Sequence, residues 1–186
     1  MEHTDARGAI IEMLTRPHGR LVAQRASTAG WTAEIRSAGG AEADASTIRF
    51  LKERTVGDRQ LHAVEFRTVD GQSRRLVIGT QQDSTGAWRV SGMAGGSGGD
   101  PPRDRPWVNL AGWGWPDDGF WGGGKVIGRD CERAARVRLR FDNGVALEDT
   151  VTNGLVLFIA EAAVQMPASV EIADGSGLRL AIHSAF

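Results

Sequence analysis

Short apolar, β-branched segments alternate with turn residues from position 47 almost to the end of the chain. The first four such segments cover residues 47–55, 60–69, 74–80 and 87–92. They are separated by Val56-Gly57-Asp58, Asp70-Gly71 and Ser84-Thr85-Gly86. Connections this short leave no room for crossover helices, so neighbouring strands must run antiparallel. The sequence therefore predicts a mainly β fold, α+β overall.

The second half repeats this signal. Further strands are expected near residues 107–110, 124–128, 135–141, 145–151, 155–161, 168–173 and 178–184. Short strands at this spacing, with turn residues between them, are typical of an antiparallel sandwich.

One helix is predicted, at the N-terminus. Thr4 or Asp5 can cap it, because side-chain oxygens of these residue types accept from the free N–H groups of a first turn. Apolar residues at Ile10, Ile11, Met13 and Leu14 follow, and Pro17 with Gly19 predicts its end.

Two hairpin registers follow from keeping apolar faces together. In the hairpin of segments 60–69 and 74–80, we expect the pairs Phe66–Leu76, Val64–Ile78 and His62–Thr80. In the second, a three-residue loop 142–144 with Gly144 in the left-handed conformation pairs Phe141 with Val145. Arg138 then faces Glu148, so the arginines at 136, 138 and 140 are interpreted as a solvated sheet face with cross-strand ion pairs.

Composition excludes several classes of function. The 186 residues carry 22 basic and 23 acidic side chains, so no global field favours nucleic acid. The single cysteine, Cys131, excludes an internal disulfide and a multi-cysteine zinc site. The four scattered histidines show no metal-ligand spacing, and we expect neither metal nor cofactor. With no secretory signal and no apolar run long enough for a membrane helix, we expect a soluble, cytoplasmic protein with no membrane partner.

Residues 92–128 are unusually rich in glycine and tryptophan. The tryptophans are Trp107, Trp113, Trp115 and Trp121. Indoles offer a large apolar face with little conformational freedom to lose, so they suit a ligand or partner surface. The same residues can instead anchor a glycine-rich segment to the core. Both interpretations remain open from sequence.

The segments VRLRFDNGVALEDTVTNGLVLFIA and ASVEIADGSGLRLAIH resemble bacterial immunoglobulin-like β-sandwich modules. The helix and meander that close on Gly86-Ala87-Trp88-Arg89-Val90 are similar to NTF2-like and cystatin-like α+β cones. These resemblances imply a cone-like part over residues 1–93, a Gly/Pro-rich connector over 94–105 and a sandwich over 106–186.

The cone interpretation implies a pocket around His62, Val64, Phe66 and Trp88, where an imidazole could act as acid or base. No acidic residue occupies an obvious partnering position on that face. The same residues can simply form the core under the helix.

No phosphate-binding loop, nucleophile elbow or metalloprotease motif is present. We therefore expect a non-catalytic module that binds a protein or small molecule through the Trp/Gly-rich loop and the domain junction. One alternative is a small-molecule binder or enzyme with a pocket around His62. Another is carbohydrate binding by Trp113 and Trp115.

Overall fold

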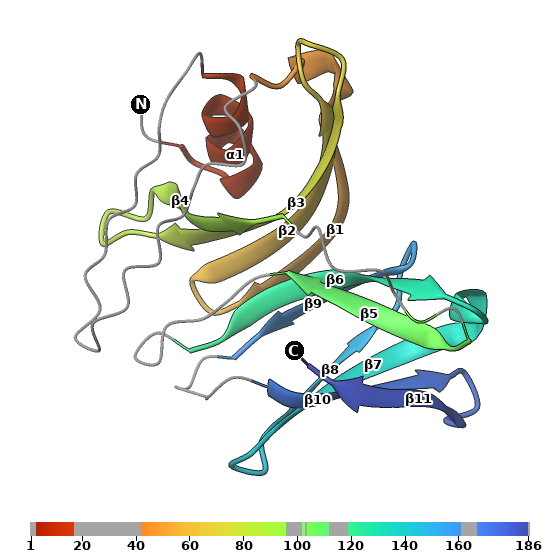
Figure 1. Cartoon of the computed structure of the whole chain (residues 1–186). Helices are drawn as coiled ribbons and strands as arrows, with labels where there is room; N and C mark the ends of the chain where they lie inside the picture. The colour runs from red at the N-terminus through yellow and green to blue at the C-terminus, as the bar shows by residue number, and fades with distance from the viewer. Residues whose placement is uncertain are drawn as a thin grey trace, which may run out of the picture.

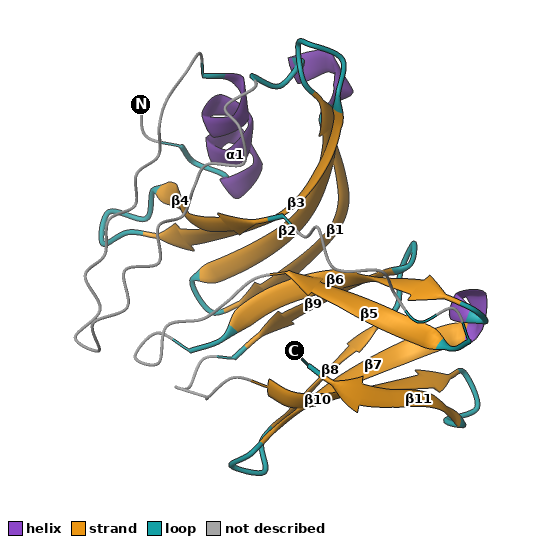
Figure 2. Cartoon of the chain, in the orientation of Figure 1, coloured by secondary structure: helices purple, strands orange, loops and turns teal. Residues whose placement is uncertain are grey.

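The computed structural model describes residues 3–16, 42–95, 102, 104–111, 119–160 and 167–185. Its elements are α1 (Ala6–Thr15), β1 (Arg49–Val56), β2 (Arg59–Arg67), β3 (Ser73–Gln82), β4 (Trp88–Ala94), β5 (Pro106–Ala111), β6 (Trp121–Gly128), β7 (Ala134–Phe141), β8 (Ala146–Thr150), β9 (Leu155–Ile159), β10 (Pro167–Asp174) and β11 (Arg179–Ser184). Short 3-10 turns lie at Ala45–Thr47 and Cys131–Arg133. The predicted mainly β fold is confirmed, and Figure 2 shows the strands and α1.

Three antiparallel sheets make up the described part of the chain. The N-terminal sheet has the order β1-β2-β3-β4, the middle sheet β5-β6-β9, and the outer sheet β11-β10-β7-β8. They lie as layers, with α1 on the far side of the N-terminal sheet (Figure 1). The middle and outer sheets together are compatible with a β-sandwich.

Helix α1 begins where the sequence predicts. The Asp5 side chain caps it and accepts from the Gly8 N–H at 2.8 Å. Ile10 and Leu14 are buried and pack in one cluster with Val64 and Ile78 of the N-terminal sheet. The apolar side of the helix therefore covers one face of that sheet.

The predicted register between β2 and β3 is wrong by two residues. Val64 pairs with Leu76 and His62 with Ile78. The cause is the length of the loop. The Thr68 N–H donates to the Gln72 carbonyl at 2.9 Å, and this hydrogen bond closes a loop of residues 69–71 only. A shift of two residues keeps each side chain on its predicted face.

The register between β7 and β8 is confirmed. The Phe141 N–H donates to the Val145 carbonyl at 2.9 Å, and Gly144 has a φ of 83°. Arg138 pairs with Glu148 at 2.6 Å. On the same face, Arg140 pairs with Glu171 of β10 at 2.9 Å. These ion pairs account for two of the three alternating arginines.

The middle sheet is covered on both faces. Val156 and Phe158 face the outer sheet and belong to its core cluster. Leu155, Leu157 and Ile159 face the opposite way, against Leu61, Ala63 and Val77 of the N-terminal sheet. Every residue of β9 is buried for this reason, which explains its uninterrupted apolar sequence.

The division into parts 1–93 and 106–186 remains a prediction, although residues of both contribute to the same apolar cluster. Most of the predicted connector, residues 96–101 and 103, lies outside the described residues.

Candidate functional site

A cleft lies between the N-terminal sheet and the middle sheet. We call it the junction cleft, and its volume is about 180 Å³. Ala63, Val77 and Ala94 line it from the N-terminal sheet, and Leu155 and Leu157 line it from β9. The cleft is therefore apolar over much of its wall and is formed by strands from both halves of the chain.

Alternation along β6 determines what the middle sheet presents to this cleft. Trp121 and Gly123 pack toward the N-terminal sheet, while Val126 packs toward the outer sheet. Lys125 is in phase with Gly123 and lines the cleft. A Cβ on Gly123 would lie 2.7 Å from the Val156 carbonyl oxygen and 3.2 Å from Val77 Cγ2. Glycine at this position permits the close approach of the two sheets.

Polar groups line the same cleft. Arg75 comes from β3, Asn109 from β5 and Lys125 from β6. Arg75 also pairs with Glu65 at 2.5 Å. Among the described residues, the ammonium group of Lys125 has no ion-pair or hydrogen-bond partner. The cleft thus combines an apolar wall with two cationic side chains from facing sheets.

An ion pair links β1 of the N-terminal sheet to β8 of the outer sheet. Lys52 Nζ lies 2.6 Å from Asp149 Oδ2, and their side chains are only 10% and 14% exposed. The Leu157 N–H donates to the same carboxylate at 2.7 Å. Arg54 Nη1 donates to the Leu157 carbonyl at 3.0 Å. These contacts fix β1 against β8 and β9.

Sequence reasoning did not identify the lining residues Arg75, Asn109 and Lys125. For Lys125 a signal was present, since Trp121, Gly123 and Lys125 alternate in one strand and must share a face. For Arg75 no such signal exists, because its position opposite Lys125 depends on how two sheets distant in sequence pack together.

His62 lies on the other face of the N-terminal sheet, under α1. His62 is 0% exposed, and neither of its ring nitrogens has a hydrogen-bond partner among the described residues. The ring meets Phe50 edge to face, with 5.7 Å between centroids. Burial lowers the pKa of the His62 imidazole, and the Glu53 carboxylate counteracts part of this effect. The neutral ring is therefore favoured.

The expectation that no acidic residue shares this face with His62 is wrong, because Glu53 of β1 lies opposite it. Glu53 Oε2 lies 3.8 Å from His62 Nδ1, beyond hydrogen-bond distance, and pairs with Arg7 of α1 at 2.7 Å. In the structure the turn is Gly57-Asp58, because Val56 belongs to β1 and not to the expected turn. Val56 therefore lies opposite Arg59, and Glu53 lies opposite His62.

The other residues of the predicted His62 pocket are buried in packed clusters. Val64 and Phe66 share a cluster with Ile10 of α1. Trp88 packs with alanines of the same helix, and its backbone N–H donates to the His3 carbonyl at 2.9 Å. The three side chains thus contact the helix that covers this face of the sheet.

The described tryptophans of the Trp/Gly-rich segment lie far apart on the middle sheet. Trp107 stacks on His183 with 3.5 Å between ring centroids, and His183 Nε2 accepts from the Val108 N–H at 3.3 Å. Trp121 packs against Gly92 of β4, where an added Cβ would lie 2.8 Å from the indole. Each one joins two sheets. Trp113 and Trp115 lie outside the described residues.

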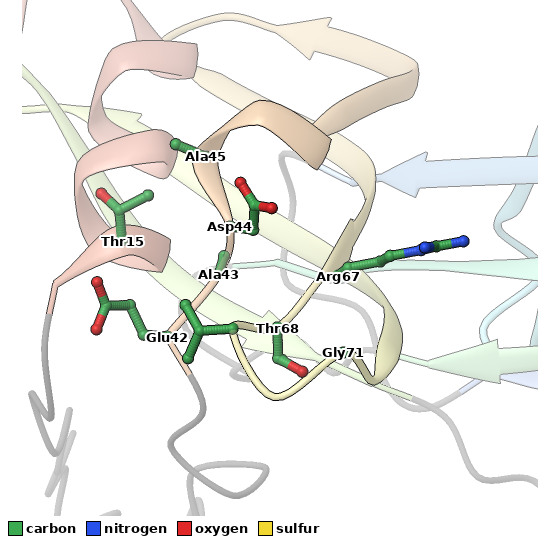
Figure 3. Close-up of a pocket in the computed structure, with 9 residues that line it drawn as sticks. Thr15, Glu42, Ala43, Asp44, Ala45, Arg67, Thr68 and Gly71 are labelled. Carbon is green, nitrogen blue, oxygen red and sulfur yellow. The ribbon is translucent and has the colours of Figure 1, made fainter.

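A second hollow, of about 550 Å³, lies between the end of α1 and the β2–β3 loop (Figure 3). The Arg67 side chain extends away from Glu42 and Thr15. The Asp44 carboxylate already has a hydrogen-bond partner, because it accepts from the Ser46 hydroxyl at 2.7 Å. This hydrogen bond lowers the pKa of the Asp44 carboxyl group. Thr68 is likewise bonded to Gln72. This hollow offers few convergent groups for a ligand.

Within the described ranges, no three His, Cys, Asp or Glu side chains gather closely enough to hold a metal ion. No helix in the same part of the chain is long and apolar enough to span a membrane. Compared with models of protein families, with curated proteins and with solved structures, the chain gives no match.

Proposed function

We propose that this protein is a non-catalytic binding protein that holds a small molecule in the junction cleft. The observation that carries the proposal is the composition of the cleft, which has an apolar wall and polar groups supplied by separate strands. Such a combination is typical of ligand sites. Its volume of about 180 Å³ is below the roughly 300–1,000 Å³ of pockets for drug-sized ligands. The ligand is therefore small.

The alternatives receive less support. A catalytic His62 would have to reach its substrate, yet His62 is 0% exposed. Trp107 stacks on His183 and Trp121 packs on Gly92, contacts that favour anchoring over a free binding platform. The immunoglobulin-like and NTF2-like assignments, and the cytoplasmic location, stay predictions from sequence.

The test uses a small neutral probe, 1-hexanol, and the full-length protein. Saturation-transfer NMR is expected to detect the probe, and Val77 and Leu157 methyl signals should shift on its addition. The variant Ala94→Leu places a larger side chain in the cleft and should abolish both effects. Ala146→Leu, at an exposed position of β8, is the matched control and should leave them unchanged. Binding that survives Ala94→Leu would contradict the proposal.

A further inference from the structure

We infer that the ligand of the junction cleft is an anion with an apolar body, of the class of short-chain aliphatic carboxylates. This inference rests on the proposed function and deepens it. It follows from three features of the cleft: its charge, the absence of Asp and Glu among its described lining residues, and its size.

The charge of the cleft is unbalanced. Arg75 and Lys125 line it from facing sheets, so one partly apolar cleft carries two positive charges. Glu65 pairs with Arg75, whereas Lys125 has no partner among the described residues. One positive charge therefore remains for a bound anion to neutralise.

The lining favours an anion over a cation or a neutral polar group. No described Asp or Glu is among the residues that line the cleft. Asn109 lines it as well, and its amide can donate to an anionic oxygen. The nearby Lys52 does not compete for the ligand, because it is already paired with Asp149 at 2.6 Å.

The size and remaining charge favour a monocarboxylate over a phosphate ester. A phosphate monoester carries nearly two charges near neutral pH, which exceeds the one unpaired positive charge. The apolar wall, with Val77, Leu155 and Leu157, suits an aliphatic chain. A volume of about 180 Å³ limits that chain to a few carbon atoms.

The test compares three probes of equal chain length: hexanoate, 1-hexanol and hexylammonium. Affinities are measured at pH 7 by NMR titration of the full-length protein. Hexanoate is expected to bind up to about five times more tightly than hexanol, the upper end of the range for one solvent-accessible ion pair. Hexylammonium should bind most weakly. Half-molar salt should reduce the preference for hexanoate.

The variant Lys125→Met removes the unpaired charge and keeps an unbranched side chain. It should make hexanoate and hexanol bind equally. Arg140→Met, which removes a positive charge on the outer sheet, is the control and should retain the preference. Equal binding of hexanoate and hexanol by the unaltered protein, or a preference that survives Lys125→Met, would overturn the carboxylate inference alone. Failure of all three probes to bind would overturn the proposed function and the inference with it.

Discussion

At the scale of single residues, the carboxylate of Asp149 shows how a charge is used inside the sheet stack. It lies against Lys52 and accepts from the backbone of Leu157. Its neighbour in sequence, Glu148, points to the opposite face of β8 and pairs with Arg138 in solvent. Adjacent acidic residues on one strand therefore have different structural roles.

Asp149→Ala is expected to lower the free energy of unfolding by about 2–4 kcal/mol, because it leaves the largely buried ammonium group of Lys52 without a negative partner. Glu148→Ala should cost under about 1 kcal/mol, as exposed ion pairs do. Urea denaturation of both variants measures the difference. Equal costs would show that the pair of Lys52 and Asp149 is not buried in solution.

The second prediction at this scale concerns His62. Burial lowers its pKa in the folded protein, so at mildly acidic pH the unfolded chain binds more protons than the folded one. Stability should therefore fall as the pH drops below about 6.5, until the folded-state pKa is reached. His183 contributes in the same direction, because burial lowers its pKa too.

The variant His62→Leu removes the unpartnered ring and should lose less stability than the parent protein between pH 8 and pH 5. The comparison requires denaturation curves of both proteins across this range. An identical pH dependence would mean that the His62 ring is not held in its neutral form. Because His183 is retained, part of the dependence should remain in the variant.

At the scale of elements, the position of β6 explains two of its own glycines. A side chain at Gly123 would meet the Val156 carbonyl and Val77, and one at Gly124 would meet the Asn109 backbone and Val108. The strand lies between two covered faces, so neither glycine has room for a Cβ. Gly123 and Gly124 are thus packing residues of a regular strand.

Gly124→Ala should destabilise the protein by about 1–3 kcal/mol, the usual cost of overpacking. Gly175→Ala is the control, since an added Cβ there meets nothing within 4 Å. Thermal unfolding of the two variants distinguishes them. A neutral Gly124→Ala would mean that β5 and β6 are less closely paired than described.

The hairpins show how much of an element can be predicted from sequence. The loop ending at Gly144 and the loop ending at Gly71 both enclose three residues and end in a left-handed glycine. The three-residue rule predicts the correct register for the β7–β8 hairpin. The same rule also describes the β2–β3 hairpin, where the Thr68 side chain bonds the backbone of Gln72 as well. Local turn chemistry is therefore sufficient to predict both registers. The two-residue error in the β2–β3 register came from matching apolar faces alone.

At the scale of the molecule, the layering of the sheets could not be predicted. The sequence indicates strands, neighbours and faces, but sheet-to-sheet packing depends on contacts between residues far apart in the chain. Leu61 and Leu157 illustrate this, since they belong to one cluster although different halves supply them. The junction cleft exists only because of that contact, so its lining could not be assembled from sequence.

The shared cluster predicts that the two halves unfold as one unit. Separately folded halves would open at different free energies, whereas a common core couples them. Leu157→Ala removes apolar volume from the middle of that core and should destabilise the whole molecule by about 2–5 kcal/mol.

Native-state hydrogen exchange on the intact chain tests this packing most directly. The most protected amides of β2 and β3 should open with the same free energy as those of β7 and β10, and Leu157→Ala should lower both values equally. If β2 and β3 open at a lower free energy of their own, unchanged by Leu157→Ala, the N-terminal sheet does not share a core with the middle sheet, and the junction cleft is not a site.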